Sequence, residues 1–334
     1  MCSSNDSNRL HDKRPLRRRG EQLLIRLLTI LFAGIVKILP LRRVRNLGNV
    51  IGWIAFRFVP RRRRLGLANM RAVLGGRCGE RELRRLLLRS AQNMAKTMLE
   101  LLKMPSMSDE QFQRFAPVTG EEHLLDALEQ GGVIVVTAHF GNWEALAARI
   151  CRLGADLTVV ARDADDSTTA SIVNRSREAM GASVVGRKSV REMLRLLQNG
   201  EVLGLLPDQH AVDGNIWVPF MGTTASTAIG PALLAHRTDS VIVPAFGLRR
   251  DDDNLEIRFL PAISVPESDD RVQNIRATTE KINEIIGEQI REHPDQWLWM
   301  HRRWRTPPSE KEKEDEGAQA NSQNAVVGES QLLR

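Results

Sequence analysis

Short apolar runs rich in β-branched residues alternate with helical patterns over most of this chain. The apolar runs include "GVIVVTA", "LTVVAR", "VLGLLPD" and "SVIVPAFGLR". Between them, segments such as "SVREMLRLLQNG" carry apolar residues at three- and four-residue spacing, which predicts helices. Strands that are apolar throughout and alternate with helices are typical of a mostly parallel sheet covered on both faces. The sequence therefore predicts an α/β fold with a mostly parallel central sheet flanked by helices.

The composition divides the 334 residues into segments of different character. Residues 1–20 are basic, and we expect them to be flexible. Residues 21–64 hold apolar stretches between basic clusters, so we expect a membrane-associated helical segment there. Residues 65–308 carry the α/β pattern and form the expected main domain. Residues 309–334 are polar and acidic-leaning, which indicates disorder.

The first apolar stretch, "LLIRLLTILFAGIVKILP", bears on a membrane location. Its uninterrupted apolar run, residues 27–36, is shorter than the roughly 20 residues that an upright spanning helix needs. Arg26 and Lys37 lie within about 20° of each other on one helical face. A cationic stripe on an otherwise apolar helix favours a helix that lies in the membrane interface or is anchored there. A true span and a soluble helix packed on the domain are the alternatives.

The basic balance of the chain implies an anionic partner. A formal net charge of +7 suits nucleic acid, an anionic membrane or an acidic protein, and charge alone does not choose among them. A second apolar stretch, "LGNVIGWIAFRFVP", is followed at once by Arg61–Arg64. A core helix with a solvated basic end and a second contact with anionic headgroups fit this stretch equally well.

The segment "AHFGNWE" carries the strongest signal for catalysis. His139 lies just past the end of an apolar strand, where ligands bind in parallel sheets. Gly141 and Asn142 can turn the chain so that Glu144, in the next helix, approaches the imidazole. A carboxylate there would select the tautomer and make His139 a general base for a hydroxyl. The pattern predicts a catalytic pair of His139 and Glu144, and a histidine that only caps the strand end is the alternative.

A second polar cluster follows the strand "VLGLLPD". Asp208, Gln209, His210 and Asp213 could join His139 and Glu144 at a metal ion, but their spacing matches no zinc motif. We expect Asp208 instead to hold a cationic partner in the site or to fix its loop. The scattered cysteines include no CxxC pair and predict neither disulfides nor a cysteine-based zinc site: Cys2, Cys78 and Cys151.

Two arginines are candidates for binding an anionic group. Arg162 ends the run "LTVVAR", and Arg177 lies in "RSREAMG". Either could bind phosphate or stabilise a developing oxyanion, and a surface ion pair is the alternative.

Tryptophans gather beside cations in "HPDQWLWMHRRWR". Such a mixture suits single-stranded nucleic acid, where bases stack on aromatic rings. The chain has only 4% aromatic residues, no tyrosine and no recognised nucleic-acid module. We therefore favour the interpretation that Trp297, Trp299 and Trp304 anchor this segment to the core or to headgroups.

These motifs, taken in order, resemble the bacterial lipid A biosynthesis acyltransferase family, whose late members add secondary acyl chains. The resemblance covers about residues 20–308 and includes "AHFGNWE", which matches the HX4(D/E) signature, "REAMG", "LLPDQ" followed by "VPFMGTTAST", and "HPDQWLWMHRRWR". Mycobacterial-type acyltransferases of phosphatidylinositol mannosides are similar in the same elements. The chain departs from the usual "FFG" at residues 220–222 and carries His210 after the "DQ" pair.

The resemblance implies a glycerolipid acyltransferase-like fold and an O-acyltransferase activity. The donor would be an acyl carrier protein or another thioester, and the acceptor a hydroxyl of a lipid A precursor or related membrane glycolipid. His139 would take the hydroxyl proton and Glu144 would orient the imidazole. Further residues are predicted at the substrate: Asn142, Arg162, Arg177, Asp208 and Gln209.

The same resemblance implies a place and partners. The enzyme would work on the cytoplasmic side of the inner membrane, against an anionic membrane surface, without metal, organic cofactor or nucleic acid. Two alternatives remain, an acyltransferase of the phosphatidylinositol mannoside type and a non-catalytic protein that binds membrane lipids.

Overall fold

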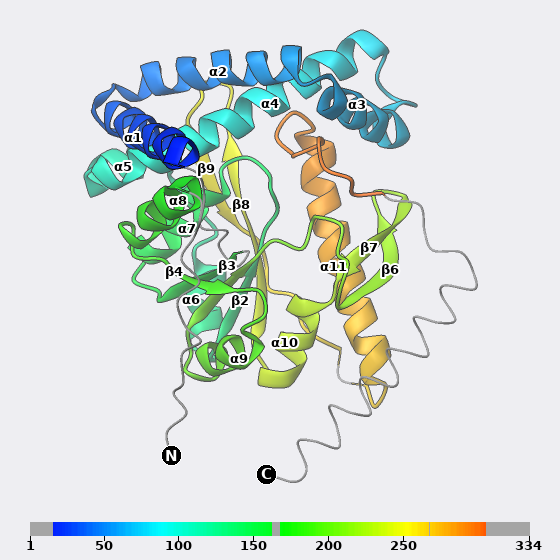
Figure 1. Cartoon of the computed structure of the whole chain (residues 1–334). Helices are drawn as coiled ribbons and strands as arrows, with labels where there is room; N and C mark the ends of the chain where they lie inside the picture. Colours follow the sequence, from blue (N-terminus) through cyan, green and yellow to red (C-terminus); the bar gives the residue numbers. More distant parts are fainter. Residues whose placement is uncertain (1–15, 162–167, 267, 305–334) are drawn as a thin grey trace, which may run out of the picture.

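The computed structural model describes residues 16–161, 168–266 and 268–304 (Figure 1). The segment 1–20, expected to be flexible, lies outside the described residues as far as residue 15, and the chain is helical from residue 16. The tail 309–334, expected to be disordered, lies wholly outside them.

A twisted sheet occupies the middle of the molecule. Within the described residues it has seven strands in the order β1-β9-β8-β2-β5-β3-β4. Neighbours from β8 to β4 pair in parallel, whereas β9 runs antiparallel to β8 and pairs in parallel with β1. The strands are β1 (Val118–Thr119), β2 (Val133–Val136), β3 (Leu157–Ala161), β4 (Ser183–Gly186), β5 (Val202–Leu205), β8 (Val241–Arg249) and β9 (Leu255–Phe259). The predicted mostly parallel sheet in an α/β fold is confirmed.

Helices cover both faces of this sheet, which explains why its strands are apolar throughout. In β2, Val133 and Val135 belong to one core cluster and Ile134 and Val136 to the other, as the two-residue period of a strand requires. The helices of the body are α5 (Asp109–Phe115), α6 (Glu122–Leu128), α7 (Trp143–Arg152), α8 (Thr168–Glu178), α9 (Val190–Gln198), α10 (Gly230–Thr238) and α11 (Arg271–Glu292). A separate antiparallel hairpin pairs β6 (Asn215–Phe220) with β7 (Thr223–Ala228) beside α11 (Figure 1).

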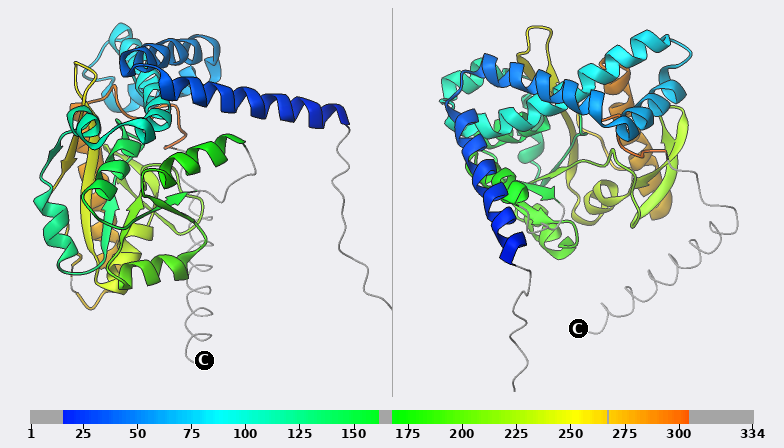
Figure 2. Two further views of the ribbon diagram at one scale, coloured as in Figure 1. Left: turned by 90° about the vertical axis from the view of Figure 1, so that its left-hand side faces the viewer. Right: turned by 45° about the horizontal axis from the view of Figure 1, so that its top comes forward.

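The helices that precede the sheet lie across one end of it. They are α1 (Leu16–Ile38), α2 (Leu41–Phe58), α3 (Pro60–Leu74) and α4 (Glu80–Lys103), and a 3-10 turn, η1 (Met104–Ser106), follows them. Figure 1 shows α2 running along α4, and in the left view of Figure 2 α1 extends outward from the body. Among the described residues, no helix has the length and apolarity that a membrane crossing would require.

Small residues bring α2 and α4 close together. Gly48 and Gly52 are buried on the face of α2 that meets α4. A Cβ at Gly48 would lie 2.8 Å from Lys96 Cγ, and one at Gly52 would lie 2.6 Å from the backbone nitrogen of Gln92. Any larger side chain there must push the helices apart.

We expect Gly52→Val to lower the free energy of unfolding by about 1–3 kcal/mol, because the added atoms collide with the backbone of α4. Gly34→Ala is the matched control, since a Cβ at this position of α1 meets nothing within 4 Å. Its better helix propensity should leave stability equal or up to about 1 kcal/mol higher. Urea unfolding measures both, and equal stability of Gly52→Val and wild type would contradict the packing argument.

Candidate active site

Two polar residues reach the same edge of the sheet because their strands pair in register. Val136 of β2 lies opposite Leu205 of β5. His139 and Asp208 each follow these partners by three residues, beyond the carboxyl ends of parallel strands. His139 Nδ1 lies 2.9 Å from Asp208 Oδ1, and the His139 backbone N–H donates to Asp208 Oδ2 at 3.0 Å.

The Asp208 carboxylate is fully buried and well supplied with donors. Besides the two donors of His139, the indole Nε1–H of Trp297 donates to Oδ2 at 2.8 Å. Burial alone would raise the pKa of Asp208, but the charge of His139 and these hydrogen bonds hold the pKa below its ordinary value. An ionised Asp208 attracts the proton to Nδ1, which leaves Nε2 as the basic nitrogen of a side chain that is 27% exposed. Gln209 Nε2 also approaches the ring, at 3.3 Å from Nδ1.

The predicted contact between Glu144 and His139 is wrong. Among the described residues Glu144 forms no hydrogen bond with the imidazole, and its buried carboxylate accepts from Arg177 instead, at 2.9 Å from Nε and 2.5 Å from Nη2. A guanidinium is a permanent cation with two parallel donors and therefore suits a buried carboxylate better than an imidazole. Burial alone would lower the pKa of Arg177, but the hydrogen bond and charge of Glu144 outweigh this effect. The pKa is therefore above its ordinary value, and Arg177 stays charged.

Trp143 joins the two predicted catalytic residues indirectly. Its indole Nε1–H donates to Glu144 Oε1 at 2.9 Å, and its ring centroid lies 5.3 Å from that of the His139 imidazole. Glu144 therefore acts on the surroundings of His139 through this ring. Sequence reasoning missed Trp143, although its place directly before Glu144 in "GNWE" was a visible signal.

Asn142, which the sequence predicts at the substrate, has a structural role. It is the N-cap of α7, where its Oδ1 accepts from the Ala145 N–H at 2.9 Å, a common role for asparagine. Its Nδ2 donates to Glu100 Oε2 at 2.8 Å, and the residue is fully buried. Both side-chain polar atoms are thus used within the protein. Arg162, the other strand-end candidate, lies outside the described residues.

The predicted turn at Gly141 is confirmed. Gly141 has φ +54, and a Cβ there would collide with the Gly247 carbonyl. The turn is held on both sides by backbone hydrogen bonds, from Gly141 N to Gln296 O at 2.9 Å, from Asn142 N to Gly247 O at 2.7 Å and from Leu298 N to His139 O at 3.0 Å. Residues 139–142 therefore lie between β8 and the segment 295–299. We name them the catalytic loop because they include the candidate base His139.

Residues 293–304, which we name the closing segment, are anchored to the core by their tryptophans, as predicted. Trp297 and Trp299 are buried, with 1% and 0% of their surface exposed, and Trp304 packs partly buried against the same cluster. Rings buried to this degree offer no face to a nucleic-acid base, so the stacking interpretation of Trp297 and Trp299 is not supported.

Two basic residues of the closing segment, Arg303 and His301, were not singled out in the sequence analysis. Arg303 is fully buried, donates to Gln209 O at 3.2 Å and Thr227 Oγ1 at 2.7 Å, and lies 4.5 Å over the Phe220 ring. Burial lowers the pKa of Arg303 to about 10 and the pKa of His301 to about 4, so His301 is neutral near pH 7. Arg303 ties the loop after β5 to the hairpin. Among the described residues, no group of three or more His, Cys, Asp or Glu is arranged to hold a metal ion.

Comparisons with known proteins agree on one family. The family model described as bacterial lipid A biosynthesis acyltransferase matches residues 13–306. The lipid A biosynthesis lauroyltransferase of Escherichia coli is 26% identical over 274 residues, which cover 81% of this chain and 88% of that protein. The palmitoleoyltransferase of the same organism is 24% identical, over 78% and 85%. A phosphatidylinositol mannoside acyltransferase of Mycobacterium tuberculosis is 23% identical, over 67% and 72%.

We expect the Asp208→Asn variant to lose stability less steeply in acid than wild type. The folded pKa of Asp208 is lowered, so its contribution is complete above the ordinary carboxyl pKa of about 4 and is lost as pH falls through the folded value. Asp213→Asn, an exposed change a few residues along the chain, should leave the slope unchanged. Urea unfolding at pH 7 and at steps below pH 4 measures these slopes, and parallel slopes in all three proteins would contradict the assignment.

Proposed function

The chain belongs to the bacterial lipid A biosynthesis acyltransferase family, and from that premise we propose that it moves a fatty acyl chain from an acyl carrier protein thioester to a hydroxyl of a lipid A precursor or related membrane glycolipid. Its relatives are named acyltransferases, and the chain is an O-acyltransferase. The observation that carries the finer proposal is the pairing of a partly exposed His139 with a buried Asp208 at the carboxyl edge of the sheet.

The proposed reaction needs one base and no cofactor. Asp208 accepts from the Nδ1–H of His139, and Nε2 takes the proton of the acceptor hydroxyl. The oxygen attacks the thioester carbonyl carbon, and the tetrahedral intermediate expels the carrier thiolate. The imidazolium then returns the proton to the thiolate. One ester bond forms and one thioester bond breaks, with no change of oxidation state.

Glu144 supports this base indirectly, through Trp143 and Arg177. Its carboxylate fixes Trp143 against the imidazole and binds Arg177, which joins the start of α7 to α8. The Arg177 guanidinium also donates to Asn174 Oδ1 at 3.4 Å. Since a guanidinium has five N–H donors, Arg177 retains capacity for an anionic group of the substrate.

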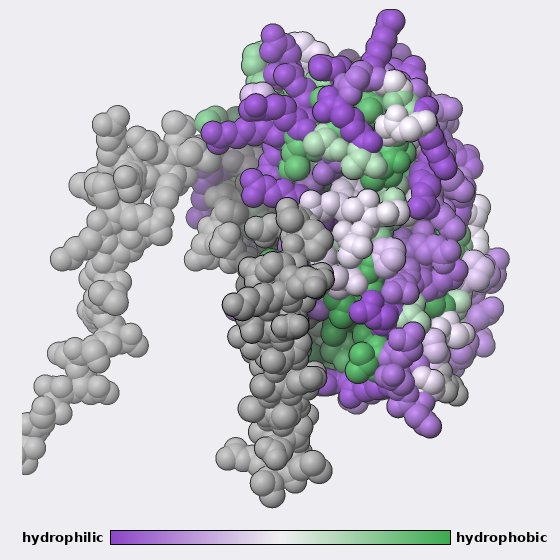
Figure 3. Space-filling view, turned by 90° about the vertical axis from the view of Figure 1, so that its right-hand side faces the viewer, coloured by the Kyte–Doolittle hydropathy of each residue, from purple (hydrophilic) through white to green (hydrophobic). Residues whose placement is uncertain are grey.

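The surface of α1 and α2 supports a place on an anionic membrane, which we propose to be the cytoplasmic side of the inner membrane. Large apolar side chains are exposed on these two helices: Leu27, Leu28, Ile30, Leu31, Phe32, Ile35, Ile38, Val50, Ile51, Trp53, Ile54 and Phe58. Exposed cations lie among them: Arg26, Lys37, Arg42, Arg43 and Arg57. Figure 3 shows hydrophobic residues among strongly hydrophilic ones near the top of the molecule. Apolar surface rimmed by arginine and lysine suits the boundary of headgroups and acyl chains.

The geometry of α2 is compatible with both interpretations of its sequence, a helix packed on the core and a contact with headgroups. Gly48 and Gly52 face α4, while Val50, Trp53 and Ile54 are exposed. The stretch "LGNVIGWIAFRFVP" therefore packs on the domain with one face and leaves the other for a membrane contact.

The reaction is tested by incubating the protein with acyl carrier protein thioesters and a membrane glycolipid extract and following lipid mass. We expect a gain of one acyl chain, lowered about 10³-fold or more in His139→Ala. His236→Ala, in the last turn of α10, is the matched control and should keep full activity. A coenzyme A thioester arm identifies the donor, and separate lipid A precursor and phosphatidylinositol mannoside arms identify the acceptor. Transfer that survives in His139→Ala would rule out His139 as the base, and absence of transfer in wild type would favour a lipid-binding protein.

The two carboxylates should differ in the same assay. Asp208→Asn removes the acceptor that selects the His139 tautomer, so we expect the rate to fall by about 10³-fold. Glu144→Gln disturbs the imidazole only through Trp143 and Arg177, so we expect a fall of about tenfold. The opposite order would restore Glu144 as the direct partner of His139.

The membrane contact is tested with phosphatidylglycerol-containing vesicles. Trp53→Asp should weaken vesicle binding about tenfold or more, because it places a charge in the apolar face of α2. Val272→Asp, at an exposed apolar position of α11, is the matched control and should bind as wild type does. Equal binding of both variants would place the membrane contact elsewhere.

A further inference from the structure

Helix α4 carries a buried polar stripe that the proposed reaction does not use directly. Its members are Ser90, Asn93, Thr97 and Glu100, at spacings of three, four and three residues. Residues at these spacings share one face of a helix. Each of them is buried, with at most 7% of its surface exposed. A row of buried polar groups must find partners, because burial without hydrogen bonds is costly.

The first half of the stripe binds the closing segment of the chain. Ser90 Oγ donates to Trp297 O at 2.5 Å, and Asn93 Nδ2 donates to Asp295 O at 2.9 Å. These carbonyls flank Gln296, whose own carbonyl accepts from Gly141 in the catalytic loop.

The second half binds the catalytic loop itself. Thr97 Oγ1 donates to Gly141 O at 2.8 Å, and Glu100 Oε2 accepts from Asn142 Nδ2 at 2.8 Å. Gly141 and Asn142 follow His139 by two and three residues. One face of α4 therefore binds two residues of the loop directly, Gly141 and Asn142.

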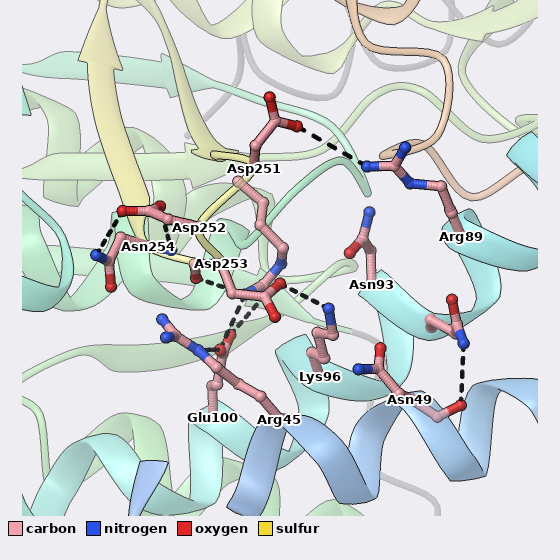
Figure 4. A network of polar contacts seen from close by, with 12 residues as sticks. Arg45, Asn49, Arg89, Asn93, Lys96, Glu100, Asp251, Asp252, Asp253 and Asn254 are labelled. Atoms are coloured by element: carbon pink, nitrogen blue, oxygen red, sulfur yellow. Dashed lines mark hydrogen bonds and ion pairs between the residues drawn. The ribbon is translucent and has the colours of Figure 1, made fainter. Parts of the chain in front are cut away.

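Glu100 differs from the other members because it is charged. Arg249 of β8 donates to both oxygens, at 2.9 Å and 2.6 Å, and Arg45 of α2 donates to Oε1 at 3.0 Å. Burial alone would raise the pKa of Glu100, but the charges and hydrogen bonds of these arginines lower it, so the carboxylate is ionised. Figure 4 shows Glu100 and Arg45 meeting between α4 and α2.

We propose that Glu100 is a positioning residue for acyl transfer: its ionised carboxylate fixes Asn142, and with it the catalytic loop that carries His139, and joins this loop to α2 through Arg45. The inference rests on the proposed function of His139. A general base must lie within a fraction of an ångström of its productive place, and a displacement of about 1 Å can cost about 10²-fold in rate.

Two variants weaken the hold on the loop in different ways. Glu100→Gln keeps the shape and an oxygen for Asn142 but removes the charge that both arginines need. Thr97→Val keeps the shape, changes no charge and removes the hydrogen bond to Gly141. If Glu100→Gln does not fold, Thr97→Val therefore tests by itself whether the hydrogen bonds from α4 position the loop. Lys96→Met is the matched control: Lys96 is a buried cation of the same helix that pairs with Asp253 at 2.6 Å and does not bind the loop.

The kinetic measurement uses the full chain with the donor and acceptor that give transfer. We expect kcat to fall about 10- to 100-fold in Glu100→Gln and about 3- to 10-fold in Thr97→Val, with KM for the donor and vesicle binding unchanged. Lys96→Met should lose stability and keep its kcat. An unchanged kcat in Thr97→Val and Glu100→Gln, or a fall no larger than in Lys96→Met, would overturn the proposal.

A measurement without substrate separates this inference from the proposed function. Hydrogen–deuterium exchange at the backbone amides of residues 139–142 should speed up at least tenfold in both loop variants and stay near wild type in Lys96→Met. Unchanged exchange in the loop variants would overturn the positioning role even if wild type transfers acyl chains. Absence of transfer in wild type would instead count against the proposed function, whatever the exchange shows.

Discussion

The geometry of the candidate active site depends on one buried carboxylate. Asp208 accepts hydrogen bonds from the ring and backbone of His139 and from the indole of Trp297, so a single anion joins the end of β2, the end of β5 and the closing segment. An ionised carboxylate inside a protein without such donors would cost several kcal/mol. Packing of these three parts against one another therefore stabilises the Asp208 anion, and the position of the candidate base His139 depends on that packing.

The buried carboxylates around this point are compensated in two different ways. Glu144 faces Arg177, and Glu100 faces Arg249, so each is balanced by a guanidinium that keeps its proton at any physiological pH. Asp208 instead faces an imidazole, whose ring N–H can donate a hydrogen bond without a permanent charge. Of these three pairs, the one at the carboxyl edge of the sheet is the one in which the proposed reaction places proton transfer.

Local patterns were enough to predict the mostly parallel sheet, the place of His139 after β2, the turn at Gly141 and the anchoring of the tryptophans. The partner of His139 was not predictable in this way. Glu144 is close along the chain, whereas Asp208 becomes a neighbour only when Val136 pairs with Leu205 in the sheet, and a strand pattern does not specify that register. Buried charges such as Glu100 and Arg303 look like surface residues in the sequence, because their partners lie on distant elements.

The contacts on both sides of the catalytic loop have a consequence for the order in which the chain folds during its synthesis. The loop is held by α4 on one side and by residues 295–299 on the other, and Arg303 holds the loop after β5. A ribosome makes α4 and β2 well before residues 295–303, and folding of a chain can begin during its synthesis. A nascent chain with the sheet already formed still lacks the indole that Asp208 requires. The hydrogen bond from Trp297 to Asp208 therefore forms only after residues 295–299 have been made and have packed against the sheet.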